Sequence, residues 1–179
     1  MRKINRIVLH CTSGWNTQTT QSIKDYWKNT LGWKQVGYHK IINNDGSIEN
    51  LAPLSVITNG VAGYNSDSVH ICYKGGLVST SKDKNGKTIY TYGDTRSPEQ
   101  KEAFRVAIKD VLEELKKNQE VDDITIVGHR DMSKDLNGNG KIEEREWVKV
   151  CPTFDTMEEY GFKIAGHKAL ERMKNRKDY

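Results

Sequence analysis

A long amphipathic helix predicted within residues 96–118 constrains the fold more than any other feature. Ser97 is suited to cap it, because its side-chain oxygen can accept the backbone N–H of Gln100, and Pro98 occupies the first helical position, where no N–H is needed. Apolar side chains then recur every three or four residues on one face, at Phe104, Ala107, Ile108, Val111, Leu112 and Leu115. A face of this length must be covered, so the sequence predicts a sheet for the helix to pack against.

Short β-rich segments on both sides of this helix can supply the sheet. They are residues 4–11, 37–51, 68–76 and 122–130, of which the second contains an Asn-Asp-Gly turn and is expected to be a hairpin. A second helix is expected from Thr19 or Thr20 to Gly32, and Asn85-Gly86 indicates a second hairpin or flap. Strands alternating with helices predict an α/β class, and the hairpins make the sheet mixed. We therefore expect one domain over residues 1–179, with a central mixed β-sheet flanked by helices.

Composition and charge exclude several classes of protein. No apolar run approaches the ~20 residues of a membrane helix, so no membrane insertion is expected. The N-terminus lacks the apolar core of a signal peptide, which predicts synthesis in the cytoplasm. The net charge of +4 is scattered apart from a basic tail at 168–179, so nucleic acid is not indicated as a partner. Three cysteines, an odd number, argue against a disulfide framework and leave one as a candidate ligand.

Two histidines end separate predicted strands, and a cysteine follows in an irregular segment. They are His10, His129 and Cys151. Structural zinc sites usually take two close pairs of ligands, whereas three scattered ligands on rigid elements leave a fourth position open, as in catalytic zinc sites. A lone histidine at a strand end is more often a hydrogen-bonded structural residue, so residue types alone leave both interpretations open.

Five motifs occur in series along nearly the whole chain. They are VLHCT at 8–12, GYHKII at 37–42, NSDSVHIC at 65–72, VGHRD at 127–131 and KVCPTFD at 149–155. This set resembles the type-2 N-acetylmuramoyl-L-alanine amidases, which include amidase-type phage lysozymes and the peptidoglycan-recognition proteins. The resemblance implies a zinc site at the strand ends. It also implies a hydrolase of a non-peptide C–N bond, the amide between N-acetylmuramic acid and the L-alanine of the stem peptide.

The resemblance also assigns roles to residues at matching positions. His10, His129 and Cys151 match the zinc ligands, Tyr38 matches a tyrosine near the metal, and Lys149 matches the lysine of the K-x-C motif. Lys149 could offer a positive charge to a tetrahedral oxyanion, and Tyr38 could donate a hydrogen bond or position water. Which of the two handles the proton stays open. Relatives that only bind peptidoglycan commonly lack the zinc cysteine, so its presence favours an enzyme.

Further positions match the region that lines the family's substrate groove. Asn65, Gly75 and Gly76 are the expected substrate contacts. His70 departs from the family, which usually has a small residue there, and a space-filling role is preferred over one in the groove. His39 is expected to face away from the site because it neighbours Tyr38, and His167 is expected at the surface.

Residues 135–146, DLNGNGKIEERE, follow the ligand pattern of a calcium loop and form a predicted insert in the domain. The candidate ligands are Asp135, Asn137, Asn139, the backbone of Lys141, and Glu146. A full EF-hand needs a helix before the loop, whereas a strand precedes this one, and the asparagines reduce the ligand charge. The alternative is an Asn/Gly-rich turn held by side-chain hydrogen bonds. Bound calcium would preset the geometry of Lys149 and Cys151.

The sequence therefore predicts a monomeric, zinc-dependent amidase that acts on the bacterial cell wall as an endolysin, with Ca²⁺ as a second candidate ion. Three alternatives stay open: an amidase that recycles soluble muropeptides, a non-catalytic peptidoglycan-binding module, and a small calcium-binding regulator. The complete set His10, His129 and Cys151 disfavours the binding module. The missing entering helix disfavours the regulator.

Overall fold

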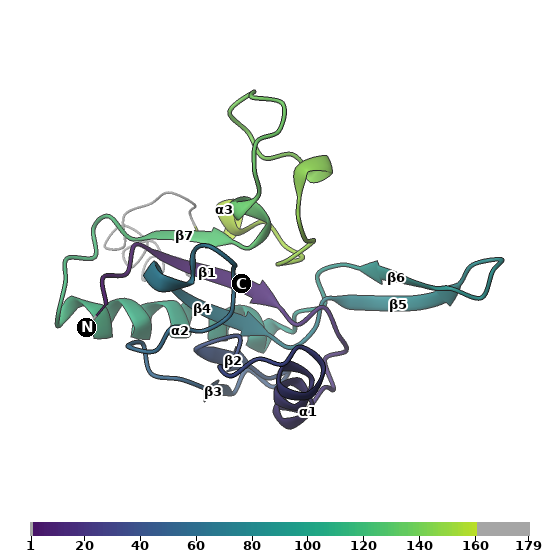
Figure 1. The fold of residues 1–179 in the computed structure, drawn as a ribbon. Coiled ribbons are helices and arrows are strands. Elements are labelled where there is room, and N and C mark those ends of the chain that lie inside the picture. The colour runs from purple at the N-terminus through teal and green to yellow at the C-terminus, as the bar shows by residue number, and fades with distance from the viewer. Residues whose placement is uncertain (1, 161–179) are drawn as a thin grey trace.

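A five-stranded sheet forms the centre of the computed structural model, which describes residues 2–160 (Figure 1). Its strands, in spatial order, are β3 (Ile48–Asn50), β2 (Lys40–Ile42), β4 (Ser68–Tyr73), β1 (Arg6–Cys11) and β7 (Thr125–Gly128). β2, β4, β1 and β7 run parallel, and β3 pairs antiparallel with β2 in the expected hairpin. The single α/β domain with a mixed sheet is confirmed.

The predicted helix α2 (Pro98–Lys116) covers one face of this sheet. Its N-terminus has the expected capping box, in which the Ser97 side chain accepts the Gln100 N–H and the Gln100 side chain accepts the Ser97 N–H. Because side chains alternate along a strand, every second residue of β1 points toward α2. The main core joins those side chains to the apolar face of the helix, including Ile7, Leu9, Ile71, Tyr73, Phe104, Ile108 and Leu112.

A shorter helical segment packs on the opposite face of the sheet. α1 (Thr20–Asp25) is capped by Thr19 and continues as a π-helical turn, η1 (Tyr26–Thr30), where the sequence predicts one regular helix. In this turn Tyr26 is exposed and Trp27 is buried. The turn ends at Thr30, and Leu31 and Gly32, whose φ is +66°, follow it. The second core cluster joins this segment to the sheet through Ile23, Trp27, Ile41 and Cys72.

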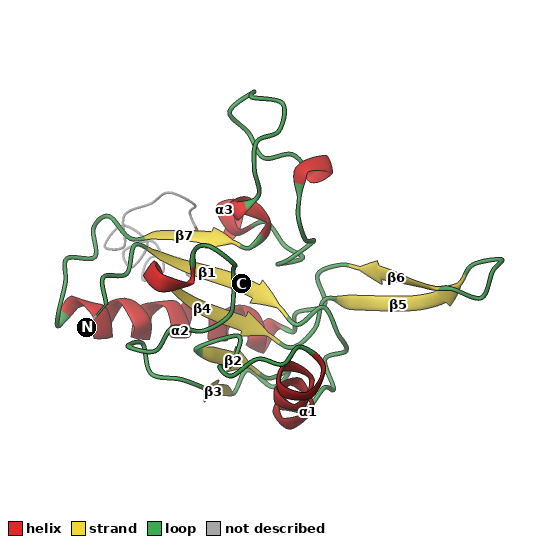
Figure 2. Cartoon of the chain, in the orientation of Figure 1, coloured by secondary structure: helices red, strands yellow, loops and turns green. Residues whose placement is uncertain are grey.

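The expected second hairpin forms a separate two-stranded sheet, β5 (Leu77–Lys82) and β6 (Thr88–Tyr92). Figure 2 shows that it projects away from the body of the domain. Its turn contains Gly86 with a φ of +79°, as the Asn85-Gly86 pair predicts.

Short helical turns follow β7 and lead to the end of the described chain. They are η3 (Arg130–Met132), η4 (Glu144–Glu146) and α3 (Thr156–Tyr160), and a further turn, η2 (Asn65–Asp67), precedes β4. The weak helical pattern from about residue 155 begins as α3, whereas His167 lies outside the described residues. Within residues 2–160, no helix is long and apolar enough to cross a membrane.

Candidate metal centre and active site

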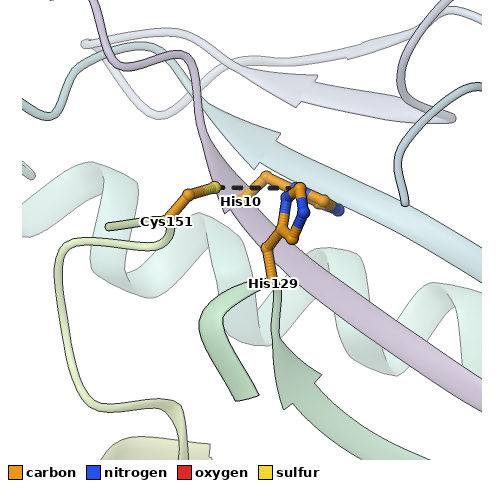
Figure 3. Close-up of side chains that lie close together, drawn as sticks. All are labelled: His10, His129 and Cys151. Carbon is orange, nitrogen blue, oxygen red and sulfur yellow. Dashed lines mark hydrogen bonds between the residues drawn. The ribbon is translucent and has the colours of Figure 1, made fainter. Parts of the chain in front are cut away.

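Strand order brings three side chains from distant parts of the sequence together. His10 lies near the carboxyl end of β1, and His129 directly follows the neighbouring parallel strand β7. Cys151 arrives from the segment after η4. The potential ligand atoms of the three residues all lie within 4.8 Å of one another, and His10 Nδ1 is 3.6 Å from Cys151 Sγ (Figure 3). The predicted cluster at the strand ends is therefore present.

The donor set and its spacing fit a zinc ion. A tetrahedral ion with Zn–N and Zn–S bonds of ordinary length sets its N and S ligands about 3.6 Å apart, which matches the distance between His10 Nδ1 and Cys151 Sγ. Burial lowers the pKa of His10 well below its ordinary value and, with the charge of Lys149, lowers that of His129 to about 4. Both imidazoles are thus neutral at pH 7, which is the form that binds metal.

Cys151 is the ligand whose charge state depends most on an ion. Burial raises the pKa of its thiol well above the ordinary value, because a lone thiolate is unfavourable in an apolar surrounding. The backbone N–H of Cys11 donates to Cys151 Sγ at 3.3 Å, a contact that favours sulfur carrying negative charge. Two neutral imidazoles and a thiol suit a cation that accepts nitrogen and sulfur ligands.

His70 contacts one of these ligands, although the sequence predicts only a space-filling role for it. His10 Nε2 lies 3.1 Å from His70 Nδ1. Because His10 Nδ1 faces Cys151, we assign the ring proton of His10 to Nε2, which then donates to His70. His70 Nε2 is buried and has no partner among the described residues. Gly60 provides the space, since a Cβ there would lie 2.3 Å from the His70 ring.

His39 is structural, as the sequence predicts, but it does not face away from the site, because its ring stacks on that of His70, which contacts His10. Its Nδ1 accepts the backbone N–H of His70 at 3.0 Å, and its Nε2 lies 3.0 Å from the carbonyl oxygen of Val56. His39 is fully buried and burial lowers its pKa to about 4, so the ring is neutral. The candidate metal ligand His10 is thus backed by two further rings, those of His70 and His39.

Tyr38 and Lys149, the two expected catalytic residues, lie at the same pocket as the cluster. The Tyr38 ring centroid is 5.0 Å from that of His10 and 5.3 Å from that of Trp27. Burial raises the pKa of Tyr38 well above its ordinary value, so its hydroxyl keeps its proton. Lys149 is exposed, and its positive charge contributes to the lowered pKa of both histidine ligands. The site therefore combines a hydrogen-bond donor with a positive charge.

The pocket has a volume of about 790 Å³ and an aromatic wall that sequence reasoning missed. Trp27 and Trp33, stacked 6.3 Å apart, form this wall with Tyr26, and Tyr92 of the projecting hairpin lies on the rim. Trp27 recurs with Ile23 and Leu31 at helical spacing, which is equally typical of a core. The sequence offers no signal that separates a pocket wall from a buried stripe.

The expected substrate contacts Asn65, Gly75 and Gly76 are not among the residues that line the pocket. Asn65 precedes the amino end of β4, whereas the cluster lies at the carboxyl ends of the strands, and its side chain accepts the N–H of Val61. The two glycines follow β4 with φ of +146° and +100°. A Cβ on Gly76 would lie 2.9 Å from Cys11 Sγ, so this glycine permits close packing beside the cluster.

The predicted calcium loop is closed by its own hydrogen bonds. The Asp135 carboxylate accepts the N–H groups of Gly138 and Gly140, and Glu146 accepts those of Leu136, Asn137 and Glu143. Asn137 and Asn139 each accept an N–H two residues ahead, from Asn139 and Lys141. These are the contacts expected of the Asn/Gly-rich turn held by side-chain hydrogen bonds. The same contacts hold the candidate calcium ligands within one loop.

Arg130, which precedes this loop, contacts the segment that follows it and carries Cys151. Its backbone N–H donates to the carbonyl oxygen of Cys151. Its guanidinium carbon lies 4.4 Å from the centre of the Trp147 ring, and Nη2 is 3.2 Å from the Asp155 carboxylate. The chain therefore leaves the site after His129 and returns to it at Cys151.

Known proteins share both the sequence pattern and the fold. The family model for N-acetylmuramoyl-L-alanine amidase matches residues 1–141. An endolysin of Klebsiella phage KP32 is 28% identical over 158 residues, which cover 86% of this chain and 83% of that protein. A Haemophilus influenzae protein is 36% identical over 111 residues, 62% of this chain and 83% of its own length.

Two solved structures illustrate the likeness in fold. The Ph2119 endolysin from Thermus scotoductus MAT2119 bacteriophage Ph2119 has a TM-score of 0.58 and 22% identity, covering 91% of this chain and 88% of that one. Drosophila PGRP-LB has a TM-score of 0.61 and 17% identity, covering 90% and 84%. At these identities the two structures show the fold alone, whereas the family model matches most of the sequence. The chain therefore belongs to the type-2 N-acetylmuramoyl-L-alanine amidase family.

Proposed function

We propose that this peptidoglycan amidase depends on zinc and hydrolyses the amide between N-acetylmuramic acid and the L-alanine of the stem peptide. The observation that carries the proposal is the cluster of His10, His129 and Cys151, whose ligand atoms lie within 4.8 Å of one another beside a pocket; His10 and Cys151 are buried and His129 is half-buried. The similarity to the endolysin of Klebsiella phage KP32 supports a role on the intact cell wall. We further propose that the protein acts as a monomer and has one amidase domain over residues 1–179, with an insert at 135–146.

The residues around the pocket divide the chemical work. His10, His129 and Cys151 would hold the ion, and a bound zinc ion would activate water and polarise the substrate carbonyl. Tyr38 Oη keeps its proton and donates a hydrogen bond to the reacting carbonyl oxygen. Lys149 Nζ supplies a positive charge where negative charge develops on that oxygen. The aromatic wall orients the substrate by packing against its apolar surfaces.

The bond that is cleaved identifies the reaction. Incubating the purified, zinc-loaded protein with intact sacculi should release the α-amino group of L-alanine without creating new reducing sugar ends. A parallel incubation with soluble muropeptides distinguishes an endolysin from an amidase that recycles muropeptides. An endolysin should act faster on sacculi. New reducing ends in place of free L-alanine amines would overturn the proposed reaction. Cleavage confined to soluble muropeptides would support the recycling role instead.

Zinc affinity should depend on His70 through its contact with His10. Replacing His70 with alanine removes the acceptor for the His10 Nε2–H and should weaken zinc binding about tenfold. This effect is near the lower end for residues that orient a metal ligand, because a water molecule can enter the vacated space and accept the same hydrogen bond. Competition with a chromophoric chelator measures this affinity without any assay of hydrolysis. His70→Asn retains a side-chain acceptor and should recover part of the loss. Unchanged affinity in a folded His70→Ala protein would contradict this role.

Calcium binding by the loop stays a prediction. Hydrogen bonds from backbone N–H groups lower the pKa of both Asp135 and Glu146, so these carboxylates are ionised at neutral pH. With two asparagines among the ligands we expect a weak site, with a Kd of about 10⁻⁴–10⁻³ M. At ten times the Kd, binding stabilises the folded state by about 1.4 kcal/mol, which raises the Tm by roughly 3–5 °C.

The calcium prediction is checked by thermal unfolding with calcium chloride or, as an ionic control, with the same concentration of magnesium chloride. Asp135→Asn preserves the shape of the side chain and removes its charge, so this variant should lose the calcium-dependent rise. A wild-type Tm that calcium does not raise would leave the loop as a hydrogen-bonded turn.

A further inference from the structure

The projecting hairpin carries two different faces. Side chains alternate along β6, so Thr88, Tyr90 and Tyr92 point to one side and Ile89 to the other. Tyr90 pairs with Thr80 across the hairpin, and Lys82 Nζ donates to the Thr88 hydroxyl at 2.7 Å. The first side, the tyrosine face, therefore consists of two aromatic rings, two threonine hydroxyls and a lysine: Thr80, Lys82, Thr88, Tyr90 and Tyr92.

The two tyrosine rings are exposed and lie nearly parallel to each other. Their centroids are 6.3 Å apart and their planes differ by 12°, so they present nearly parallel faces. Tyr90 is 54% exposed and Tyr92 is 40% exposed. A two-stranded hairpin has no core of its own in which such rings could be buried. Adjacent exposed aromatic side chains with polar groups around them are typical of a binding surface.

This surface is continuous with the pocket at the metal cluster. Tyr92 lines the same pocket as Cys151 and Lys149. From Tyr92 the strand β6 runs outward to Tyr90 and Thr88, along the hairpin that projects from the domain (Figures 1 and 2). A polymer whose reacting bond lies at the cluster can therefore leave the pocket along the tyrosine face.

We propose that the tyrosine face binds the glycan strand of peptidoglycan next to the muramic acid whose amide is cleaved. Pyranose rings expose flat C–H surfaces that pack on the electron-rich faces of tyrosine rings, and their hydroxyls match the threonine hydroxyls. The hairpin also carries Lys82, Lys84 and Lys87 against Asp83, and this net positive charge suits a wall polymer that bears carboxylates. The proposal rests on the proposed function, and it extends the substrate from one muramoyl-peptide to the polymer.

Two neighbouring positions on opposite faces of β6 allow a matched test. The probe is soluble glycan strands of alternating N-acetylglucosamine and N-acetylmuramic acid from which the stem peptides have been removed, titrated into the zinc-loaded protein. Tyr90→Ala should weaken binding about tenfold, as expected for a tyrosine that anchors an interface. Ile89→Ala removes a side chain of similar exposure, 47%, from the other face and should change affinity less than twofold. The ratio of sacculus hydrolysis to muropeptide hydrolysis should also fall in Tyr90→Ala.

Several outcomes would overturn the glycan proposal. One is equal glycan affinity of Tyr90→Ala and wild type, and another is an equal loss in Ile89→Ala, which would indicate a general effect on the hairpin. A loss of affinity for free stem peptides in place of glycan would assign the face to the peptide. A wild-type dimer that Tyr90→Ala dissociates in sedimentation would assign it to a second copy of the chain. Release of L-alanine amines by wild type is scored separately, so failure of the proposed reaction is distinguishable from failure of the glycan surface.

Discussion

Replacing Cys151 with alanine is expected to abolish stoichiometric zinc binding and to lower amide hydrolysis at least about a thousandfold, a loss of roughly 4 kcal/mol of transition-state stabilisation. Cys151 is the one ligand of the cluster that can carry a negative charge, and its sulfur lies 3.6 Å from His10 Nδ1. Without it, two neutral imidazoles remain, which hold a divalent cation weakly. Zinc per chain is measured by elemental analysis after gel filtration, and hydrolysis by the release of L-alanine amines.

Cys72→Ala provides a matched control for the loss of a buried thiol. Cys72 lies on the same face of the sheet as His10 and is fully buried. It packs in the core cluster of Ile23, Trp27 and Ile41 and is not a candidate zinc ligand. This variant should unfold more easily, by roughly 1 kcal/mol, because it leaves a small cavity. It should still bind one zinc ion. Hydrolysis by Cys151→Ala at the rate of the wild-type protein would contradict the zinc mechanism.

Removing the charge of Lys149 should lower kcat about 10²- to 10³-fold while zinc stays bound. Groups placed where negative charge develops commonly contribute this much to a rate. Lys149 lines the pocket and lies two residues before Cys151, so the segment that carries the candidate ligand also brings this lysine to the pocket. Lys149→Ala is compared with Lys134→Ala, which removes an exposed lysine that does not line the pocket. Steady-state kinetics on soluble muropeptides and zinc content give the two readouts.

Tyr38→Phe complements the lysine variant. The substitution retains the ring that packs 5.0 Å from His10 and removes only the hydroxyl proton. We expect kcat to fall by a factor similar to that of Lys149→Ala, with KM nearly unchanged, because the hydrogen bond strengthens as charge develops on the carbonyl oxygen. A variant pair that retains the kcat of the wild-type protein would exclude both residues from charge stabilisation.

The parts of the fold governed by local rules were predictable from the sequence. The capping box at Ser97 and Gln100, the end of the first helical segment at Gly32 and the Asn85-Gly86 turn all occur as expected, because each depends on a few neighbouring residues. The π-helical turn after Asp25 was not predicted, since no residue in that stretch breaks the helical pattern. The burial of Trp27 favours it through tertiary packing.

The site was only partly predictable, because it depends on which strands are neighbours. Ends of parallel strands meet at one edge of a sheet, so placing His10 and His129 together followed once both were assigned to strand ends. The contact between His10 and His70 needs the register that pairs Val8 with His70, which the pattern of apolar residues does not specify. The role of Asn65 as a substrate contact stays a prediction: the residue precedes the amino end of β4, whereas the cluster lies at the carboxyl ends of the strands.

The contacts of Arg130 allow the length of the following loop to change without a change in the positions of His10, His129 and Cys151. Since the Arg130 N–H holds the Cys151 carbonyl and its guanidinium holds Trp147 and Asp155, the chain between them starts and finishes at one fixed point. Closing a longer loop between fixed ends costs little extra entropy, roughly 0.6 kcal/mol for each doubling of length. We therefore expect the tip of this loop to tolerate insertions, such as an affinity tag, without displacement of His129 or Cys151.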